Sequence, residues 1–368
     1  MAGIYIHIPF CASKCIYCGF YSSTRHLNRQ DQYIKAVLKE MELRHDYLGA
    51  DNVRTIYIGG GTPSLLSKKN LLLLSEKFNN NSVIEFTMEC NPDDITPSLC
   101  ETMSTMGVNR VSMGVQTFND NILRFLHRRH TSAHILPAIT MLRQAGIENI
   151  SIDLMFGFPD ETITQWQQDI NIALKLNVQH ISAYSLMYEE GTPLYQMLKH
   201  GEIKENKENC SAEMYSILLD TLSAAGYEHY EISNFALPGY RSIHNSCYWN
   251  DTHYIGLGAA AHSYNGTSRQ WNVSDIDDYI SSIESGCMHI EQETIDARTH
   301  YNDMVTTALR TREGINLNLL DKEQKDYIIK NARKCIDAGA LTIHDNRMAL
   351  TRKGLYISDD VMSELIWI

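Results

Sequence analysis

Short runs of β-branched and apolar residues alternate with longer amphipathic segments through the first half of this 368-residue chain. The expected strands lie at Ile4–Ile8, Thr55–Ile58, Val83–Met88, Arg110–Val115, Ile150–Phe156 and His180–Leu186. The expected helices between them lie at Gln32–Leu43, Leu65–Phe78, Pro97–Met106, Thr131–Ala145 and Thr162–Leu176. Strands that alternate with helices form βαβ units around a parallel sheet. The pattern therefore predicts an α/β protein, and six units predict a partial (β/α)6 barrel, because the closed form has eight.

Polar motifs follow these strands at the points where the strands end. The segment Cys11–Cys18 follows the first strand and Gly59–Pro63 follows the second, while Glu89 and Gln116 end the third and fourth. Asp153 lies within the fifth strand. Because the carboxyl ends of parallel strands meet at one edge of a sheet, ligands bind there. The sequence predicts a composite site at this edge.

Cys11, Cys15 and Cys18 have the spacing CxxxCxxC. Three thiolates on one loop can hold three irons of a [4Fe–4S] cluster, and the fourth iron then stays open to a small molecule. A structural zinc ion requires four ligands, and no fourth Cys or His follows at a useful spacing. A zinc site or free thiols are the alternatives.

The run Gly59-Gly60-Gly61-Thr62-Pro63 lets the backbone approach a ligand and offer its N–H groups to a carboxylate. A phosphate loop is excluded because no Gly-Lys-Ser/Thr follows. A tight turn between strand and helix is the alternative interpretation.

Glu89, Gln116, Arg128 and Asp153 are the remaining polar residues of the predicted edge. An ionisable residue such as Asp153 inside an apolar strand is costly unless it is paired or functional. From chemistry alone, each could bind a ligand or could be an ordinary residue of the rim.

The alternating pattern loosens after residue 190. From about Ala297, helices accompany a two-stranded element, Leu341–Ile343 and Arg347–Leu350, which is typical of a small winged-helix-like domain. We therefore divide the chain into a barrel at 1–190, a barrel-associated region at 191–296 and a C-terminal domain at 297–368. With 32 basic and 44 acidic residues the formal net charge is −12, which disfavours nucleic-acid binding by that domain.

The segment His244-Asn245-Ser246-Cys247-Tyr248-Trp249 lies in the barrel-associated region. A neutral imidazole is a common axial heme ligand, and aromatic neighbours pack against a macrocycle. We interpret His244 as a heme ligand. The alternatives are a packed histidine in an aromatic loop and a thiolate ligand from Cys247.

The cysteine spacing after the first strand, with Tyr17 before the last cysteine and GGGTP after the second strand, resembles the radical-SAM superfamily. The resemblance implies that S-adenosylmethionine (SAM) chelates the open iron, and it implies the capacity to cleave SAM to a 5′-deoxyadenosyl radical. It assigns SAM contacts to Tyr5, Tyr17, Gly60, Gly61, Thr62, Glu89, Gln116, Arg128 and Asp153.

Within that superfamily the chain resembles the branch of oxygen-independent coproporphyrinogen III dehydrogenase. That enzyme has a fourth cysteine where this chain has Phe20, and an N-terminal extension where this chain starts its first strand at Ile4. Both differences, with the HNxxYW motif at His244, make the chain similar to the HemW family of heme chaperones. The resemblance implies heme transfer to client hemoproteins and predicts no coproporphyrinogen oxidase activity.

Two rival functions are a true coproporphyrinogen III dehydrogenase and a winged-helix regulator with a cluster sensor. A homodimer and transient contact with membrane-bound respiratory hemoproteins are further interpretations. The N-terminus, Met1-Ala2-Gly3-Ile4-Tyr5, lacks the basic and apolar regions of a signal peptide, and no apolar run reaches the length of a membrane span. The sequence predicts a cytoplasmic protein without nucleic-acid partners.

Overall fold

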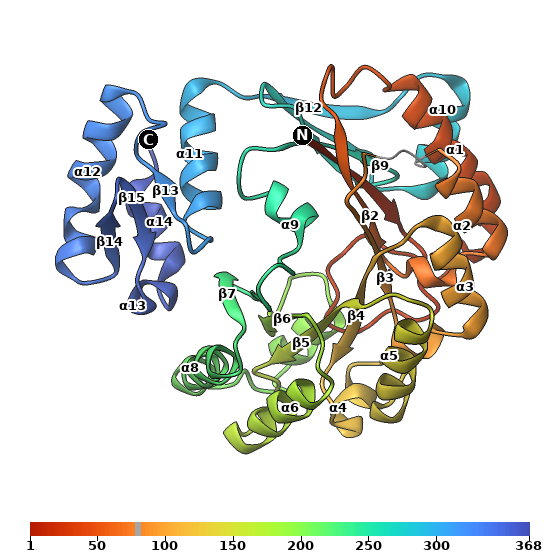
Figure 1. The fold of residues 1–368 in the computed structure, drawn as a ribbon, viewed down its shortest axis with the longest axis horizontal. Coiled ribbons are helices and arrows are strands. Elements are labelled where there is room, and N and C mark those ends of the chain that lie inside the picture. Colours follow the sequence, from red (N-terminus) through yellow and green to blue (C-terminus); the bar gives the residue numbers. More distant parts are fainter. Residues whose placement is uncertain (78–81) are drawn as a thin grey trace.

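The computed structural model describes residues 1–77 and 82–368, and its main element is a sheet of 12 strands in the order β12-β11-β10-β9-β1-β2-β3-β4-β5-β6-β8-β7 (Figure 1). The six central strands are parallel neighbours. They are β1 (Ala2–Ile8), β2 (Val53–Gly60), β3 (Glu85–Cys90), β4 (Arg110–Gln116), β5 (Asn149–Phe156) and β6 (His180–Ser185). All six predicted strands are confirmed within two residues at each end.

Helices connect the central strands, as the alternating pattern predicts. They are α1 (Gln30–Leu43), α2 (Lys68–Ser75), α3 (Pro97–Met106), α4 (Asp120–Phe125), α5 (Ile135–Gln144) and α6 (Ile163–Lys175). Short 3₁₀ turns precede several of them, at Leu27–Arg29, Pro63–Leu65, Pro92–Asp94 and Ser132–His134. The predicted helix Leu65–Phe78 begins later, because the Ser67 side chain accepts a hydrogen bond from the Asn70 N–H (3.2 Å) and caps α2 there. Its predicted end, Phe78, lies outside the described residues.

The barrel-associated region extends both edges of the same sheet. On one side β9 (His253–Leu257) pairs parallel with β1 and leads to β10 (His262–Tyr264), β11 (Ser268–Asn272) and β12 (Ile290–Thr294). On the other side β8 (Asn234–Ala236) and β7 (Glu228–Glu231) continue antiparallel from β6. The helices of this region are α7 (Pro193–Lys199), α8 (Glu208–Ala224), α9 (Ile243–Cys247) and α10 (Ile276–Ser285).

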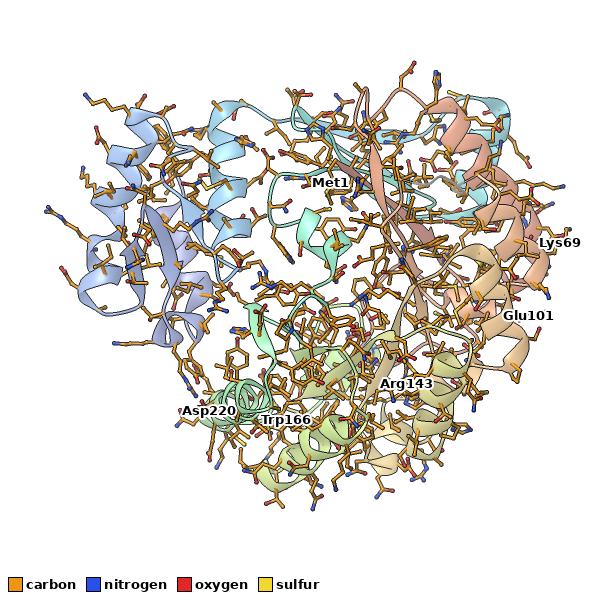
Figure 2. The ribbon with its side chains drawn as sticks, viewed as in Figure 1. Met1, Lys69, Glu101, Arg143, Trp166 and Asp220 are labelled. Carbon is orange, nitrogen blue, oxygen red and sulfur yellow. The ribbon has the colours of Figure 1, made fainter. Side chains whose placement is uncertain are left out.

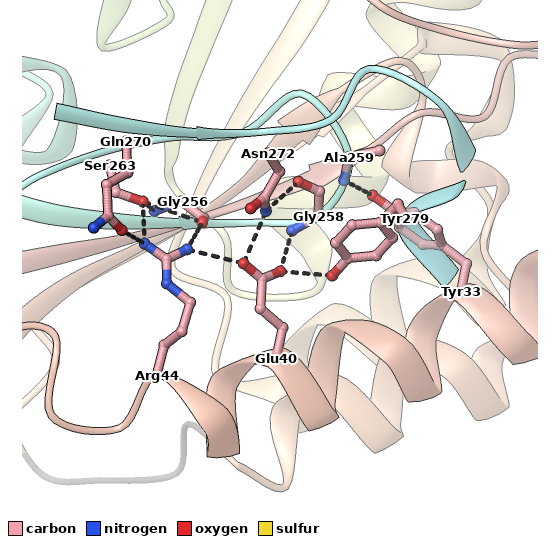
Figure 3. Close-up of polar contacts among 10 residues, drawn as sticks. All are labelled: Tyr33, Glu40, Arg44, Gly256, Gly258, Ala259, Ser263, Gln270, Asn272 and Tyr279. Atoms are coloured by element: carbon pink, nitrogen blue, oxygen red, sulfur yellow. Dashed lines mark hydrogen bonds and ion pairs between the residues drawn. The ribbon is translucent and has the colours of Figure 1, made fainter. Parts of the chain in front are cut away.

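A buried ion pair attaches α1 to the β9 edge of the sheet (Figure 3). Glu40 and Arg44 lie one helical turn apart and are joined at 2.8 Å. The Glu40 carboxylate also accepts hydrogen bonds from Asn272 (2.8 Å), the Gly258 N–H (2.9 Å) and the Tyr279 hydroxyl (2.6 Å). A buried charge pair is tolerated only when its remaining hydrogen-bonding capacity is used, and this network meets that condition.

The C-terminal unit has its own small sheet and core, separate from the main sheet (Figure 1). Its strands are β13 (Ile315–Asn316), β14 (Leu341–His344) and β15 (Arg347–Leu350), in the order β13-β15-β14. Its helices are α11 (Ala297–Ala308), α12 (Lys322–Asp337), α13 (Arg352–Leu355) and α14 (Ser358–Leu365). The predicted strand pair is therefore present within a three-stranded sheet. No helix in the described part of the chain is long and apolar enough to cross a membrane.

Direct contacts hold this unit against the main sheet. Arg352 at the start of α13 donates to Asp220 (2.7 Å), which Figure 2 shows on α8 below the C-terminal unit. Backbone hydrogen bonds join Ile232 N–H to the Arg310 carbonyl and Arg312 N–H to the Tyr230 carbonyl, both at 3.0 Å. The two parts are thus joined at the β7 edge as well as by their linker.

Candidate functional site

The predicted cysteine loop is held at the carboxyl edge of the sheet by backbone hydrogen bonds. Cys11 N–H donates to the Ser23 carbonyl (3.0 Å), and Ile16 N–H donates to the Leu126 carbonyl (3.3 Å). The Ile16 carbonyl in turn accepts from Leu194 N–H (3.0 Å). All three cysteines of the loop are free thiols and partly exposed. Segments far apart in the sequence therefore fix one short loop that presents three sulfur atoms.

The glycine run lies beside this loop at distances that exclude a side chain. Gly60 has a φ of +111°, and a Cβ there would lie 2.6 Å from the His7 ring. A Cβ on Gly61 would lie 2.8 Å from the Phe10 carbonyl oxygen and 3.0 Å from Cys11 Sγ. Both positions require glycine because the chain passes directly against β1 and the cysteine loop.

Glu89 and Asp153 place two carboxyl groups at the edge. Glu89 accepts hydrogen bonds from the Tyr57 hydroxyl (2.8 Å) and from Gly60 N–H (2.9 Å), while burial raises its pKa to about 7. Asp153 accepts from the Ser112 hydroxyl at 3.3 and 3.4 Å, and burial likewise raises the pKa of its carboxyl. In the described part of the chain neither carboxyl group forms an ion pair, and for both of them burial is the largest cause of the raised pKa.

Arg128 connects the cysteine loop to the ends of the third and fourth strands. Its guanidinium donates to Asn91 Oδ1 (2.6 Å) and to the Gly114 carbonyl (2.7 Å), and it lies 3.5 Å from Cys15 Sγ. Its Nε–H is buried without an acceptor in the described part of the chain. Gln116, at the end of β4, has a left-handed backbone with a φ of +68°. Such strain at a non-glycine residue persists only where the surroundings enforce it.

These residues surround one cavity of about 390 Å³. The predicted residues that line it are Cys11, Cys15, Tyr17, Cys18, Gly60, Gly61, Thr62, Glu89, Gln116, Arg128 and Asp153. Tyr5 is not among its lining residues, because its hydroxyl bonds to His7 Nδ1 (3.0 Å) and its ring lies beside Tyr57. The structure thus brings together every predicted SAM and cluster residue except Tyr5.

The donor set fits an iron–sulfur cluster better than a single ion. Among residues 1–77 and 82–368, no three His, Cys, Asp or Glu side chains are arranged to hold one metal ion. In a cubane each thiolate binds a different iron, so the three sulfur atoms do not need to converge. Cys11, Cys15 and Cys18 all line the cavity together with Gly60 and Gly61.

Sequence reasoning missed several residues that line this cavity. They are Tyr57, Asn91, Ser112, Ser182, Tyr184 and Asn245. Tyr57, Ser112 and Ser182 lie on strands, where the side-chain alternation of period two could have placed them on the face of Glu89 and Asp153. Asn245 belongs to the HNxxYW segment, and no local signal connects that segment with the cysteine loop.

His244 occupies a different environment from the cavity-lining residues. Its ring is fully buried, and its Nδ1 pairs with the Thr55 hydroxyl (2.9 Å) while its Nε2 pairs with the Tyr248 hydroxyl (3.0 Å). The ring stacks on Tyr57 at 5.2 Å, and burial lowers its pKa to about 3. Both nitrogens are occupied in this arrangement, so iron ligation by His244 requires the Tyr248 or Thr55 hydroxyl to be displaced.

Comparison with known proteins agrees with this geometry. The model of the radical SAM superfamily matches residues 5–173, the segment that contains the cysteine loop, GGGTP and the central strands. The solved coproporphyrinogen III oxidase (HemN) of Escherichia coli, a radical SAM enzyme, superposes with a TM-score of 0.86 over 99% of this chain and 90% of that chain, at 21% identity. The fold is that of a radical SAM protein.

Two relatives show which family within this superfamily the chain resembles. The chain is 34% identical to heme chaperone HemW of Bacillus subtilis over 100% of its own length and 99% of the relative. It is 31% identical to heme chaperone HemW of Lactococcus lactis over 98% of this chain and 96% of the relative. The chain belongs to the HemW family within the radical SAM superfamily.

Proposed function

We propose that this protein is a heme chaperone that carries a [4Fe–4S] cluster and SAM and passes heme to client hemoproteins. The observation that carries the proposal is that three free cysteines meet the GGGTP backbone and the carboxyl groups of Glu89 and Asp153 in one cavity. Full-length similarity to proteins named heme chaperones supports the cargo. Membrane-bound respiratory hemoproteins as clients, a homodimer and a cytoplasmic location belong to the same proposal.

Cys11, Cys15 and Cys18 would hold the cluster, and SAM bound to it supplies one-electron chemistry at its sulfonium. Glu89 lines the cavity and is placed to accept a hydrogen bond from an ammonium group, while the Gly60 N–H donates to the same carboxylate and holds it in place. Arg128 donates toward the Cys15 sulfur at 3.5 Å and would help to hold that side chain at the cluster site.

Coproporphyrinogen oxidation is the rival activity. Phe20 stands where the rival enzyme has a fourth cysteine, and it lines the mouth of the cavity with 72% of its surface exposed. We propose that the chain does not convert coproporphyrinogen III. Porphyrin chromatography after incubation with SAM and a reductant measures this, and protoporphyrinogen formed over many turnovers would contradict it.

Anaerobic reconstitution followed by hemin titration tests the proposed function. The parent should load about four irons and four sulfides per chain and should then bind hemin with a distinct Soret band. Replacing Cys11, Cys15 and Cys18 together with Ala should remove the cluster absorption but leave hemin binding. A chain that binds no hemin is not a heme chaperone, and unchanged iron loading in the triple variant would remove the cluster assignment.

A further inference from the structure

His244 is held at three points, by strands of the barrel and by its own segment. Its backbone N–H donates to the buried Glu85 carboxylate at 2.8 Å, and the Ile243 N–H donates to the same carboxylate at 2.8 Å. On the ring, Nδ1 pairs with the Thr55 hydroxyl at 2.9 Å and Nε2 pairs with the Tyr248 hydroxyl at 3.0 Å. The ring therefore has one fixed orientation, and its two nitrogens have partners from different parts of the molecule.

Thr55 belongs to the rigid centre of the sheet. It lies in β2, where it pairs in register with Gly3 of β1 and Glu85 of β3, and it has no exposed surface. A Cβ on Gly3 would lie 2.9 Å from Thr55 Oγ1 and 3.1 Å from His244 Nδ1, so both groups pack tightly against β1. The Nδ1 side of the ring therefore cannot open without deformation of the sheet.

Tyr248, the partner on the other nitrogen, has room to move. It follows α9, and it lines a cavity of about 550 Å³ that lies between the HNxxYW segment and α11. Asn250 and Asp251, which come shortly after it, are exposed. Because empty volume adjoins the tyrosine, its hydroxyl can leave Nε2 without any change in the sheet. Nε2 is therefore the nitrogen of His244 that can become free.

The surrounding hydrogen bonds indicate which nitrogen of His244 carries the proton. Cys247 donates its thiol proton to the Ile243 carbonyl oxygen at 3.3 Å. Burial raises the pKa of this thiol to about 11, and a hydrogen bond from Thr55 opposes the rise. The Thr55 hydroxyl proton thus has an acceptor in the Cys247 sulfur, which leaves Thr55 Oγ1 to accept from His244 Nδ1–H. Nε2 then has a free lone pair, which accepts from the Tyr248 hydroxyl.

This tautomer is the one that ligation through Nε2 requires. A metal binds the imidazole nitrogen that has a free lone pair, and the hydrogen bond on the other nitrogen decides which one that is. An acceptor for the remaining N–H also fixes the ring and makes it a stronger ligand. A hydroxyl at Nδ1 therefore selects the ligating form of the histidine before heme arrives.

We propose that Thr55 is a positioning residue for heme binding, which holds His244 in the Nδ1–H tautomer, while the Tyr248 hydroxyl occupies Nε2 until heme iron replaces it. The inference rests on the proposed function, with His244 as the heme ligand. It adds to that function a residue 189 positions away in the sequence. Thr55 acts on the iron only through the imidazole ring.

Nitrogen-15 NMR of the histidine-labelled apoprotein tests the tautomer without heme. The ring signals that disappear in His244→Asn belong to His244, and in the parent they should show the proton on Nδ1. Thr55→Val keeps the shape of the side chain but removes the acceptor, so the proton should move to Nε2, where the Tyr248 oxygen can accept it. Thr55→Ser should restore the pattern of the parent.

Thr87→Val is the matched control for Thr55→Val. Thr87 is fully buried, and its register with Tyr57 places it on the same face of the sheet as Thr55. Its hydroxyl has no partner in the described part of the chain. The substitution therefore removes an equally buried hydroxyl and should leave the His244 signals unchanged. Iron loading equal to that of the parent shows that each variant keeps its fold.

Hemin titration of the cluster-loaded chain tests the consequence for ligation. Thr55→Val should bind hemin about tenfold more weakly. The iron–histidine stretching band in the resonance Raman spectrum of its reduced heme complex should move to lower frequency, because Nδ1–H has lost its acceptor. Thr55→Ser and Thr87→Val should match the parent in both measurements. Tyr248→Phe should bind hemin at least as tightly as the parent, because no hydroxyl has to be displaced.

The two measurements separate the inference from the function on which it rests. A proton on Nε2 in the parent, or hemin binding by Thr55→Val equal to that of the parent, would overturn the role of Thr55 and leave the heme chaperone proposal in place. Weaker binding by Tyr248→Phe would overturn the displacement of its hydroxyl by iron. A parent with the proton on Nδ1 that binds no hemin would refute the proposed function itself.

Discussion

At the scale of single residues, the chemistry of this protein depends on groups that burial holds in an uncommon state. His244 is neutral because it has no exposed surface, and both of its nitrogens are bonded to hydroxyl groups. Glu89 has a pKa of about 7 for the same physical reason. Each of these residues contacts Tyr57, so one tyrosine connects the buried histidine with the carboxyl group of the SAM cavity.

The neutral state of His244 predicts a pH dependence of stability. Its pKa is about 3 in the folded protein against 6.5 in the unfolded chain, so the unfolded state takes up the proton first as the pH falls. The stabilising contribution is complete above pH 6.5 and is lost between pH 6.5 and 3, by about 5 kcal/mol at most.

Urea unfolding of the reduced apoprotein at pH 7 and pH 5 measures this dependence. The free energy of unfolding should fall less between these two pH values in His244→Asn than in the parent. His289→Asn should match the parent, because that ring is half exposed. Equal losses in the parent and in His244→Asn would mean that His244 is not held neutral.

The close approach at Gly61 predicts a steric effect on the cluster. Gly61→Ala places a methyl group 3.0 Å from Cys11 Sγ and 2.8 Å from the Phe10 carbonyl oxygen, so the cysteine loop must move. Such overpacking costs about 1–3 kcal/mol. Iron loading after reconstitution should fall at least twofold.

Gly49→Ala is the control for Gly61→Ala. A Cβ at Gly49 meets nothing within 4 Å, although its φ of +57° makes the substitution mildly strained. Iron loading should therefore stay at the level of the parent. Full loading in Gly61→Ala would show that the loop tolerates the displacement.

At the scale of elements, the sequence predicts local patterns well and long-range pairing poorly. The six central strands are buried on both faces and read as apolar runs, so their positions follow from composition. The apolar pattern predicts a helix that begins at Leu65, but α2 begins at Lys68 because the Ser67 side chain caps it there. Strands β7–β12 were not predicted, because each is only three to five residues long, and β8 and β9 attach to the sheet through the distant strands β6 and β1.

In the candidate site too, local motifs could be predicted from the sequence and long-range contacts could not. Cys11, Cys15, Cys18 and the GGGTP run are contiguous motifs, so spacing alone identified them. Tyr57 and Ser182 were missed because their place in the cavity depends on strand register. The buried environment of His244 depends on Thr55, which lies 189 residues away in the sequence, and no local pattern contains that contact.

The attachment of α1 to the β9 edge predicts a large effect of one conservative change. Glu40→Gln leaves the Arg44 guanidinium buried without its anionic partner, and breaking such a pair costs about 3–5 kcal/mol. Glu42→Gln on the same helix is the control, because its ion pair with Lys77 is exposed and is worth less than about 1 kcal/mol.

Chemical denaturation of the three apoproteins at pH 7 checks this prediction. The denaturation midpoint should fall strongly for Glu40→Gln and hardly at all for Glu42→Gln. Similar midpoints for both variants would mean that hydrogen bonds from Asn272 and Tyr279 retain the packing without the charge (Figure 3).

At the scale of the whole molecule, the C-terminal unit completes a wall that the barrel lacks. The Arg269–Asp303 ion pair (2.6 Å) and the backbone bonds at Arg310 and Arg312 hold α11 opposite the HNxxYW segment. The cavity of about 390 Å³ at the cysteine loop and a cavity of about 550 Å³ beside α11 then lie on either side of one partition, the HNxxYW segment. A path of contacts crosses it: Glu89 to the Tyr57 hydroxyl, the Tyr57 ring to His244, and His244 to the Tyr248 hydroxyl.

This path predicts that the two cavities are energetically coupled. If SAM rearranges Glu89, the position of Tyr248 in the HNxxYW segment changes with it, and hemin affinity should differ at least fivefold with and without SAM. Thermodynamic linkage requires hemin to change SAM affinity by the same factor. Tyr57→Phe keeps the stack on His244 but removes the hydrogen bond to Glu89, so the coupling factor should fall toward one.

Tyr254→Phe is the matched control, because Tyr254 lines the cavity beside α11 and has no hydrogen bond to Glu89 in the described part of the chain. Isothermal titration of the cluster-loaded protein with each ligand, alone and in the presence of the other, gives the factor in both directions. The parent and Tyr254→Phe should share one coupling factor, and Tyr57→Phe should lose it while still binding both ligands. Independent binding in the parent would mean that the partition separates the two cavities without transmitting occupancy from one to the other.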